Sequence, residues 1–153
     1  VWEGEPEIRT DLLRRVALGT PHIAGYSFDG KVNGTVMLYR AACDFLGMPP
    51  LWDPTPLLPA PEVPSLALCA DGRSDEDVLR EAVLAVYPIE RDDAALRAVE
   101  DAPPGERGPL FDRLRRDYPR RREFPHTRVT VTGADPQRVA ALTQTLHELG
   151  FGV

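Results

Sequence analysis

The chain has 153 residues, 42% of them hydrophobic, which is enough for one ordinary domain or two small ones with a buried core. The formal net charge of −6 argues against a nucleic-acid groove or an anionic membrane surface as the main partner. No apolar run approaches the roughly 18 residues of a membrane helix. Cys43 and Cys69 lack the spacing of a metal site, so we interpret them as reduced core residues of a cytoplasmic protein.

Residues 1–28 have the composition of loops and strand ends. We expect a short helical turn over residues 12–15, followed by an extended segment that leads into a loop around His22. Thr20 precedes a proline, and residues in that position favour extended backbone.

A helix is expected over residues 29–48. Asp29 can cap its amino-terminus, and Gly47 with two following prolines marks its end. Apolar residues recur there at helical spacing: Val32, Val36, Tyr39, Cys43 and Leu46.

Residues 49–64, PPLWDPTPLLPAPEVP, hold seven prolines in sixteen positions. Such a segment is extended and semi-rigid, which is typical of a linker between domains. A ligand for a proline-binding domain is the alternative, and the linker is the favoured interpretation.

Residues 65–153 alternate between strand and helix patterns. SLALCA and TRVTVTG have the composition of strands. Helices are expected from the Ser74 cap to about Tyr87, and from the Asp135 cap to Gly150. Two shorter helices, DDAALRAVE and GPLFDRLRRDY, lie between them. This order predicts a small α+β domain.

His22, in the stretch TPHIAGYS, is the first candidate for chemistry. An ordinary histidine titrates near pH ~6.5, and it works best as an acid or base when a carboxylate orients it. Glu3, Glu5, Glu7 and Asp11 are the upstream candidates, and Glu5 lies between a glycine and a proline, where the backbone is constrained. By spacing alone, a hydrogen-bonded structural histidine is the commoner case.

The surrounding sequence supports chemistry. VWEGEPE, together with LLRRVALGTPHIAGYSFDGKVNGT over residues 12–35, resembles the end of the nucleotide-binding domain of the D-2-hydroxyacid dehydrogenase family. LLPAPE, VYPIERDDAALR and FDRLRRDYPRRREF resemble a branch of that family that acts in vitamin B6 synthesis. The resemblance covers essentially the whole chain. It implies an α/β remnant of a Rossmann-type nucleotide-binding domain with a crossing helix, followed by a small α+β dimerisation domain.

The resemblance also implies roles for individual residues. His22 matches the acid/base that removes the 2-hydroxyl proton of 4-phospho-D-erythronate while hydride passes from C2 to NAD. Glu5 matches the carboxylate that holds the ring and supports its positive charge, in the manner of a triad aspartate. Gly25 matches a backbone position against the cofactor, where a side chain would block close approach. Tyr26 matches a substrate contact. No metal is implied.

The resemblance divides the chain into four parts. Residues 1–28 are the end of the nucleotide-binding domain, and residues 29–48 are a helix that returns to the substrate domain. Residues 49–64 are the linker, and residues 65–153 form the domain through which a homodimer assembles. The family's glycine-rich loop, ribose-binding acid and substrate arginine are not found here, so we expect them before Val1 and expect this piece alone to be inactive.

Two alternatives stay open. One is another member of the family, such as phosphoglycerate dehydrogenase, and the other is a non-catalytic dimerisation or small-molecule-sensing module.

Six arginines over residues 113–122 could bind a phosphate, but interleaved acidic residues favour a solvated helix face. His126 and His147 are expected at the surface, and Trp2 is expected to pack.

Overall fold

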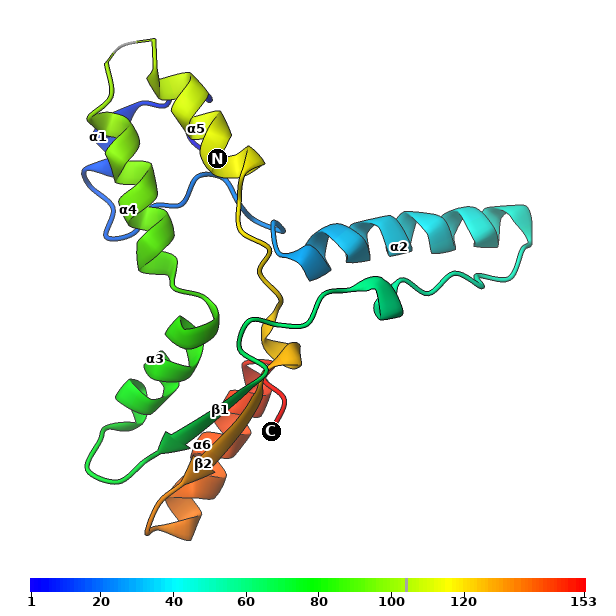
Figure 1. Ribbon diagram of the computed structural model, residues 1–153, viewed down its shortest axis with the longest axis vertical. Helices are drawn as coiled ribbons and strands as arrows, with labels where there is room; N and C mark the ends of the chain where they lie inside the picture. The colour runs from blue at the N-terminus through cyan, green and yellow to red at the C-terminus, as the bar shows by residue number, and fades with distance from the viewer. Residues whose placement is uncertain (104) are drawn as a thin grey trace. The chain divides into compact units, whose positions relative to one another are not determined.

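The computed structural model describes residues 1–103 and 105–153 (Figure 1). These residues form two compact units, each built from two stretches of the chain: residues 1–24 with 88–119, and residues 25–87 with 120–153. Residues 65–153, expected to form one carboxyl-terminal domain, therefore contribute to both units.

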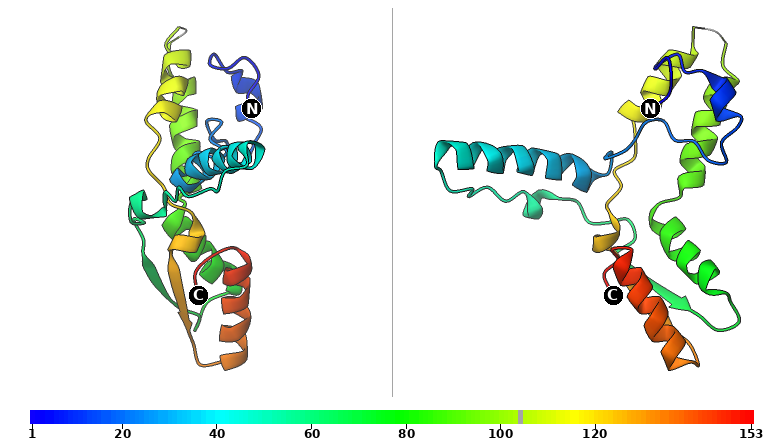
Figure 2. Two further views of the ribbon diagram at one scale, coloured as in Figure 1. Left: turned by 90° about the vertical axis from the view of Figure 1, so that its right-hand side faces the viewer. Right: turned by 180° about the vertical axis from the view of Figure 1, so that it is seen from behind.

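The first unit combines α1 (Thr10–Leu13) with the neighbouring helices α4 (Ile89–Glu100) and α5 (Arg107–Arg116). The turn expected over residues 12–15 thus begins earlier, at Thr10. The core side chains come from these helices and the loop before α1: Ile8, Leu13, Leu96, Val99 and Phe111. In both views of Figure 2 the amino-terminal segment lies along α4 and α5. Burial of apolar surface therefore fixes the first residues of the chain on these two helices.

Polar side chains of α4 fix the segment between α1 and the His22 loop. The Arg97 guanidinium donates to the carbonyls of Leu13 and Val16 at 3.1 and 3.0 Å, and to Asp93 at 2.8 Å. The backbone N–H of Gly19 donates to Asp93 at 2.7 Å. Carbonyls at the end of a helical turn need such donors, so Arg97 completes α1 from a distant helix.

The second unit contains a two-stranded parallel sheet, in which β1 (Ser65–Cys69) pairs with β2 (Arg128–Thr132) from Ser65↔Arg128 to Cys69↔Thr132. The helices α3 (Asp75–Val86) and α6 (Pro136–Glu148) pack against it, as Figure 2 shows. The core combines both helices with one face of the sheet: Leu68, Ala70, Val78, Ala82, Val129, Val131, Leu142, Leu146 and Phe151. The described part of the chain is therefore a small α/β fold.

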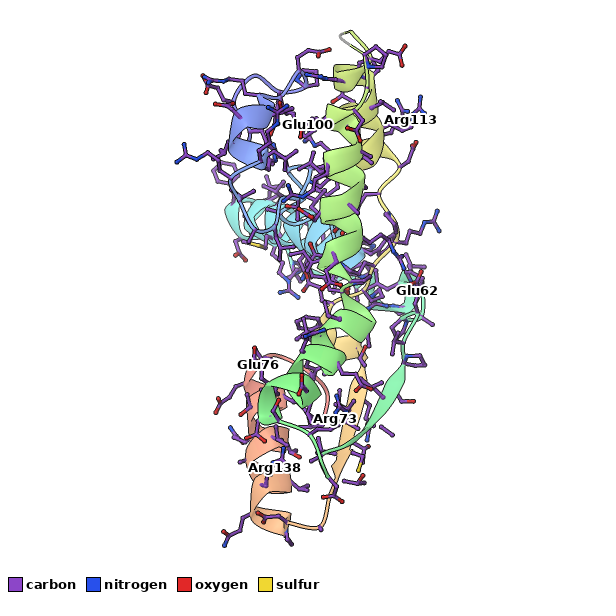
Figure 3. All side chains as sticks on the ribbon, turned by 90° about the vertical axis from the view of Figure 1, so that its left-hand side faces the viewer. Glu62, Arg73, Glu76, Glu100, Arg113 and Arg138 are labelled. Carbon is purple, nitrogen blue, oxygen red and sulfur yellow. The ribbon has the colours of Figure 1, made fainter. Side chains whose placement is uncertain are left out.

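Arg138 of α6 ties the helices to the end of β1. Its guanidinium donates to the carbonyls of Ala70 and Arg73 at 2.8 and 2.6 Å, and to Asp75 at 2.7 Å. Figure 3 labels Arg138 and Arg73 within this unit. The link joins the first residue of α3 to α6 and closes the loop after β1.

The alternation of the strands corrects one expectation. Leu68 faces the core and is 2% exposed, so Cys69, the next residue, points to the opposite face. Cys69 is exposed while Cys43 is buried, and both are free thiols. The interpretation of both cysteines as core residues is therefore wrong for Cys69.

The helix α2 (Phe28–Leu46) begins with a different cap from the one expected. Ser27 is the cap, and its hydroxyl accepts from the Gly30 N–H at 2.9 Å. Asp29 is buried, and its carboxylate binds the Arg122 guanidinium instead of capping the helix. The end at Gly47 is confirmed, with a left-handed φ of 65°.

The remaining helices follow the sequence patterns closely. The caps Ser74 and Asp135 are confirmed, because each side chain accepts hydrogen bonds from backbone N–H groups in the first turn of its helix. The helix expected over DDAALRAVE is longer and begins at Ile89. None of the described helices is long and apolar enough to cross a membrane.

Candidate active site

Glu5 and His22 form a hydrogen-bonded pair in the first unit. Nδ1 of His22 lies 2.7 Å from Oε2 of Glu5. The other carboxylate oxygen accepts the backbone N–H of Trp2 at 2.8 Å. The carboxylate is therefore held at both oxygens, and it directs the Nδ1 side of the ring inward.

The TPH sequence sets the position of the ring. His22 has a φ of +53°, in the left-handed region that residues other than glycine seldom adopt. Its backbone N–H donates to the Thr20 carbonyl at 2.9 Å, which closes a tight turn around Pro21. Pro21 is buried. A stiff residue and a closed turn together fix where the histidine side chain leaves the backbone.

Trp2 positions both members of the pair. Its backbone N–H binds Glu5, and its indole Nε1–H donates to the Thr20 carbonyl at 2.8 Å. The ring also lies close to Gly19, where an added Cβ would be 3.1 Å from it. The sequence indicated only a packing role for Trp2, because the indole hydrogen bond joins residues that are 18 positions apart.

The environment keeps Glu5 ionised. Burial acts to raise the pKa of Glu5, but the hydrogen bonds from His22 and the Trp2 N–H, with the charges of His22 and Arg115, outweigh it and lower the pKa below its usual 4.5. The Glu5 side chain is 17% exposed and the His22 side chain 36% exposed. The carboxylate is thus more shielded from solvent than the imidazole ring.

Gly25 and Tyr26 belong to the second unit, whereas Glu5 and His22 belong to the first. Gly25 has a φ of +73°, and a Cβ added there would meet no atom within 4 Å. Tyr26 lies under the Lys31 ammonium, which is 4.5 Å from the ring centre. The structure thus brings two of the four candidate residues together.

The arginines of residues 113–122 do not act as one face. Arg113, labelled in Figure 3, and Arg116 are exposed on α5, as the solvated-face interpretation predicts. Arg122 is 8% exposed, and that interpretation is wrong for it. Arg121 places its guanidinium 4.3 Å from the centre of the Tyr87 ring.

The buried arginine belongs to a polar cluster that the sequence analysis missed. Arg122 and His126 both contact Asp29, with His126 Nε2 at 3.0 Å from a carboxylate oxygen. The His126 side chain is 37% exposed, so it is at the surface as expected but is not free. Arg122 and Asp29 are 93 residues apart in the sequence, so a local sequence pattern could not predict that they form a pair.

Comparison with known proteins adds a family. A protein-family model described as a domain of unknown function, DUF3410, matches residues 57–150. The chain belongs to the DUF3410 family. The matched region includes α4 and α5, so DUF3410 residues form the surface on which residues 1–24 pack.

Similar curated proteins carry a more informative name. The chain is 47% identical to the erythronate-4-phosphate dehydrogenase of Marinobacter nauticus, over 99% of this chain and 38% of that protein. It is 43% identical to the Yersinia enterocolitica protein of the same name, over 99% of this chain and 37% of that protein. It is 44% identical to the Ectopseudomonas mendocina protein of that name, over 95% of this chain and 38% of that protein. The chain thus spans 37–38% of the length of these relatives, in their carboxyl-terminal portion. These relatives confirm the resemblance seen in the sequence, and for the first two the match over 99% of the chain extends beyond the DUF3410 region to residues 5 and 22.

Proposed function

We propose that the complete protein containing this chain oxidises 4-phospho-D-erythronate to 2-oxo-3-hydroxy-4-phosphobutanoate with NAD, a step in the synthesis of pyridoxal 5′-phosphate. The observation that carries the proposal is the 2.7 Å contact between His22 Nδ1 and the Glu5 carboxylate, whose side chain is only 17% exposed. The names and the 42–47% identity of the similar proteins support the choice of substrate. We propose that the protein acts in the cytoplasm.

His22 is the acid/base in this proposal. With Nδ1–H bound to Glu5, Nε2 presents a lone pair that can accept the proton of the substrate's 2-hydroxyl group. The C2–H bond then breaks with its electron pair, and a C=O bond forms at C2. The Glu5 carboxylate stabilises the imidazolium that results and keeps the ring in one tautomer.

Gly25 is the residue of this chain that fits a nicotinamide cofactor. The proposal follows from its place in the TPHIAGY stretch, since Gly47, Gly72 and Gly150 share its left-handed φ and its open space; at Gly25 that space would let a flat ring approach the backbone. When bound, the nicotinamide supplies the acceptor for the hydride that leaves C2. We propose Tyr26 as a substrate contact, and we propose that the remainder of the complete protein supplies the glycine-rich loop and the arginine for the substrate carboxylate.

The proposed domain organisation assigns residues 1–28 to the end of a Rossmann-type nucleotide-binding domain and residues 29–48 to a helix that returns to the substrate domain. That helix exposes large apolar side chains, with Met37 at 72% and Phe45 at 89%, as a docking helix would. Residues 49–64 are the linker, and residues 65–153 carry the homodimer interface.

An activity assay of the complete protein tests the proposal. NADH formation is followed with 4-phospho-D-erythronate, and 3-phosphoglycerate serves as the matched substrate of the alternative dehydrogenase. We expect a higher kcat/KM for the first substrate. Turnover of 3-phosphoglycerate alone would assign the protein to another branch, and no turnover of either would favour a non-catalytic module.

A further inference from the structure

We propose that residues 121–126 hold the first residues of α2 in place, and through them position the preceding loop, residues 25–27, for substrate and cofactor. The buried contact between Arg122 and Asp29 is the main attachment. The proposal rests on the proposed function, because Gly25 and Tyr26 are the ligand contacts suggested for that loop. Both segments belong to the second unit. Arg122 and Asp29 are positioning residues here, since they act through their neighbours.

Asp29 is bound from several directions. Arg122 Nε lies 3.1 and 3.0 Å from its two carboxylate oxygens, and Arg122 Nη2 lies 3.0 Å from one of them. The Glu123 N–H donates to the carboxylate at 2.9 Å, and His126 Nε2 lies 3.0 Å from it. The side chains of Asp29 and Arg122 are each 7% exposed. A forked guanidinium in a buried place fixes orientation as well as distance.

The two residues before Asp29 are also hydrogen-bonded to residues 121–123. The Phe28 N–H donates to the Arg121 carbonyl at 2.8 Å, and the Ser27 hydroxyl donates to Glu123 at 2.5 Å. Three consecutive residues, the cap of α2 and its first two helical residues, are therefore bound to residues 121–123. The Ser27 hydroxyl caps α2 by accepting from Gly30, and the Arg121 carbonyl accepts the Phe28 N–H, which has no acceptor within the helix. Residues 121–123 therefore supply part of the cap of α2.

The other end of the positioning segment is anchored in the core. Phe124 stacks on Phe151, with ring centres 4.4 Å apart, and the Thr127 hydroxyl donates to the Val63 carbonyl at 2.7 Å. Arg122 also donates to the Pro59 carbonyl in the proline-rich segment. Residues 121–126 therefore connect the loop to the sheet and to the proline-rich segment at once.

Gly30 transmits the position of the helix to Gly25. A Cβ on Gly30 would lie 2.9 Å from the Gly25 carbonyl oxygen and 2.9 Å from the Ser27 hydroxyl. The start of α2 is therefore in direct contact with the backbone of Gly25, and a displaced helix start moves that residue. Gly34, one turn further along α2, has no atom within 4 Å of the same added Cβ.

The test uses four variants of the complete enzyme: Arg122→Met, Arg122→Lys, Gly30→Ala and the control Gly34→Ala. We expect Arg122→Met and Gly30→Ala to raise the KM for 4-phospho-D-erythronate or NAD by about tenfold, the equivalent of one lost charge-assisted hydrogen bond, with a smaller change in kcat. Arg122→Lys should recover part of the loss, and Gly34→Ala should leave KM unchanged.

Amide hydrogen exchange separates this proposal from the proposed function. In Arg122→Met and Gly30→Ala the amide of Phe28 should exchange faster, while the core amide of Val131 should be protected as in the wild type. Faster exchange with unchanged KM, or a fall in melting temperature alone, would reduce the cluster to a structural ion pair and overturn the proposal. A wild-type protein without dehydrogenase activity would refute the proposed function, and unchanged Phe28 exchange in the variants would still refute the attachment.

Discussion

Oε2 of Glu5 lies 2.7 Å from Nδ1 of His22, although 17 positions separate the two residues in the chain. The contact depends on a closed turn at His22, on a carboxylate held by the Trp2 N–H, and on helices α4 and α5, which carry the segment between them. A titratable ring on a stiff turn is suited to proton transfer, because a base must be held at a fixed place to act on one hydroxyl group.

Replacing His22 should abolish most of the activity without unfolding the protein. In the complete enzyme we expect His22→Gln to lower kcat by at least about 100-fold, since it removes a positioned general base. His147→Gln is the matched control, because His147 is exposed on α6. Steady-state rates test the loss of activity, and melting temperatures test whether the fold is kept. A near-normal kcat in His22→Gln would show that His22 is not the general base.

Glu5→Gln should change the pH dependence of the reaction. The glutamine oxygen can still accept the Nδ1–H bond, but it carries no charge to stabilise an imidazolium, so the acid limb of the pH profile of kcat/KM for oxidation should move to lower pH. The pKa of Glu5 is lowered in the folded protein because its hydrogen bonds outweigh its burial, so the wild-type carboxylate keeps its charge to lower pH than an unperturbed glutamate. A profile identical to that of the wild type would separate Glu5 from the chemistry.

Asp29 should govern stability in acid. The Asp29 carboxyl is buried, which raises its pKa, but the Arg122 and Glu123 hydrogen bonds and the nearby charges of Arg122 and His126 lower it below 3.8. Its contribution to stability is therefore complete above that unfolded value and is lost as pH falls through the lower, folded one. We expect Asp29→Asn to cost about 3 kcal/mol near neutral pH.

Urea unfolding of the complete wild-type protein and of Asp29→Asn over a series of pH values measures this difference. The gap between the two proteins should narrow as pH falls below the usual aspartate value. Asp44→Asn, in an exposed carboxylate on the same helix, is the control and should show no such gap. A difference that stayed constant with pH would show that the Asp29 charge is not the source of the stability.

Local chemistry explains what the sequence could predict. Ser74 and Asp135 were identifiable as caps because their acceptors reach N–H groups two or three residues away. The strand β2 was equally predictable, because buried and exposed residues alternate along five consecutive positions. Glu5 was chosen from four carboxylates through a family resemblance, since spacing alone does not distinguish them.

The features that escaped prediction depend on distant residues. The Asp29–Arg122 contact joins positions 93 apart, and it removes Asp29 from the capping role that its place before an apolar pattern suggested. Arg97 reaches the Leu13 carbonyl 84 positions away. Tertiary contacts of this kind override local preference, and they also explain why residues 88–119 pack with the start of the chain.

Arg97 of α4 offers a test of that packing. Arg97→Met removes the donors to the carbonyls of Leu13 and Val16 and leaves Asp93 without its ion-pair partner. We expect a loss of about 1–3 kcal/mol of stability, from carbonyls left without protein donors, and a lower kcat, because the segment leading to His22 loosens. Arg91→Met, at an exposed position on the same helix, should change neither quantity. Destabilisation without any change in kcat would show that the His22 turn is held by other contacts.

The homodimer is the last prediction, and the second unit suggests where to test it. Within the described residues the sheet has two strands, and its outward face carries the exposed residues Ala67, Cys69 and Thr130. A sheet this narrow gains stability when a further layer covers it. Two copies related by a twofold axis would bury the same face twice, so one substitution would act on both sides of the interface.

We therefore expect the complete protein to have the mass of a dimer in light scattering over a wide range of concentration. Ala67→Arg should shift it toward the monomer, and Ala140→Arg, on the exposed side of α6, should not. A wild-type protein that stays monomeric and folded at high concentration would refute the dimer, and an undisturbed Ala67→Arg dimer would place the interface on another surface.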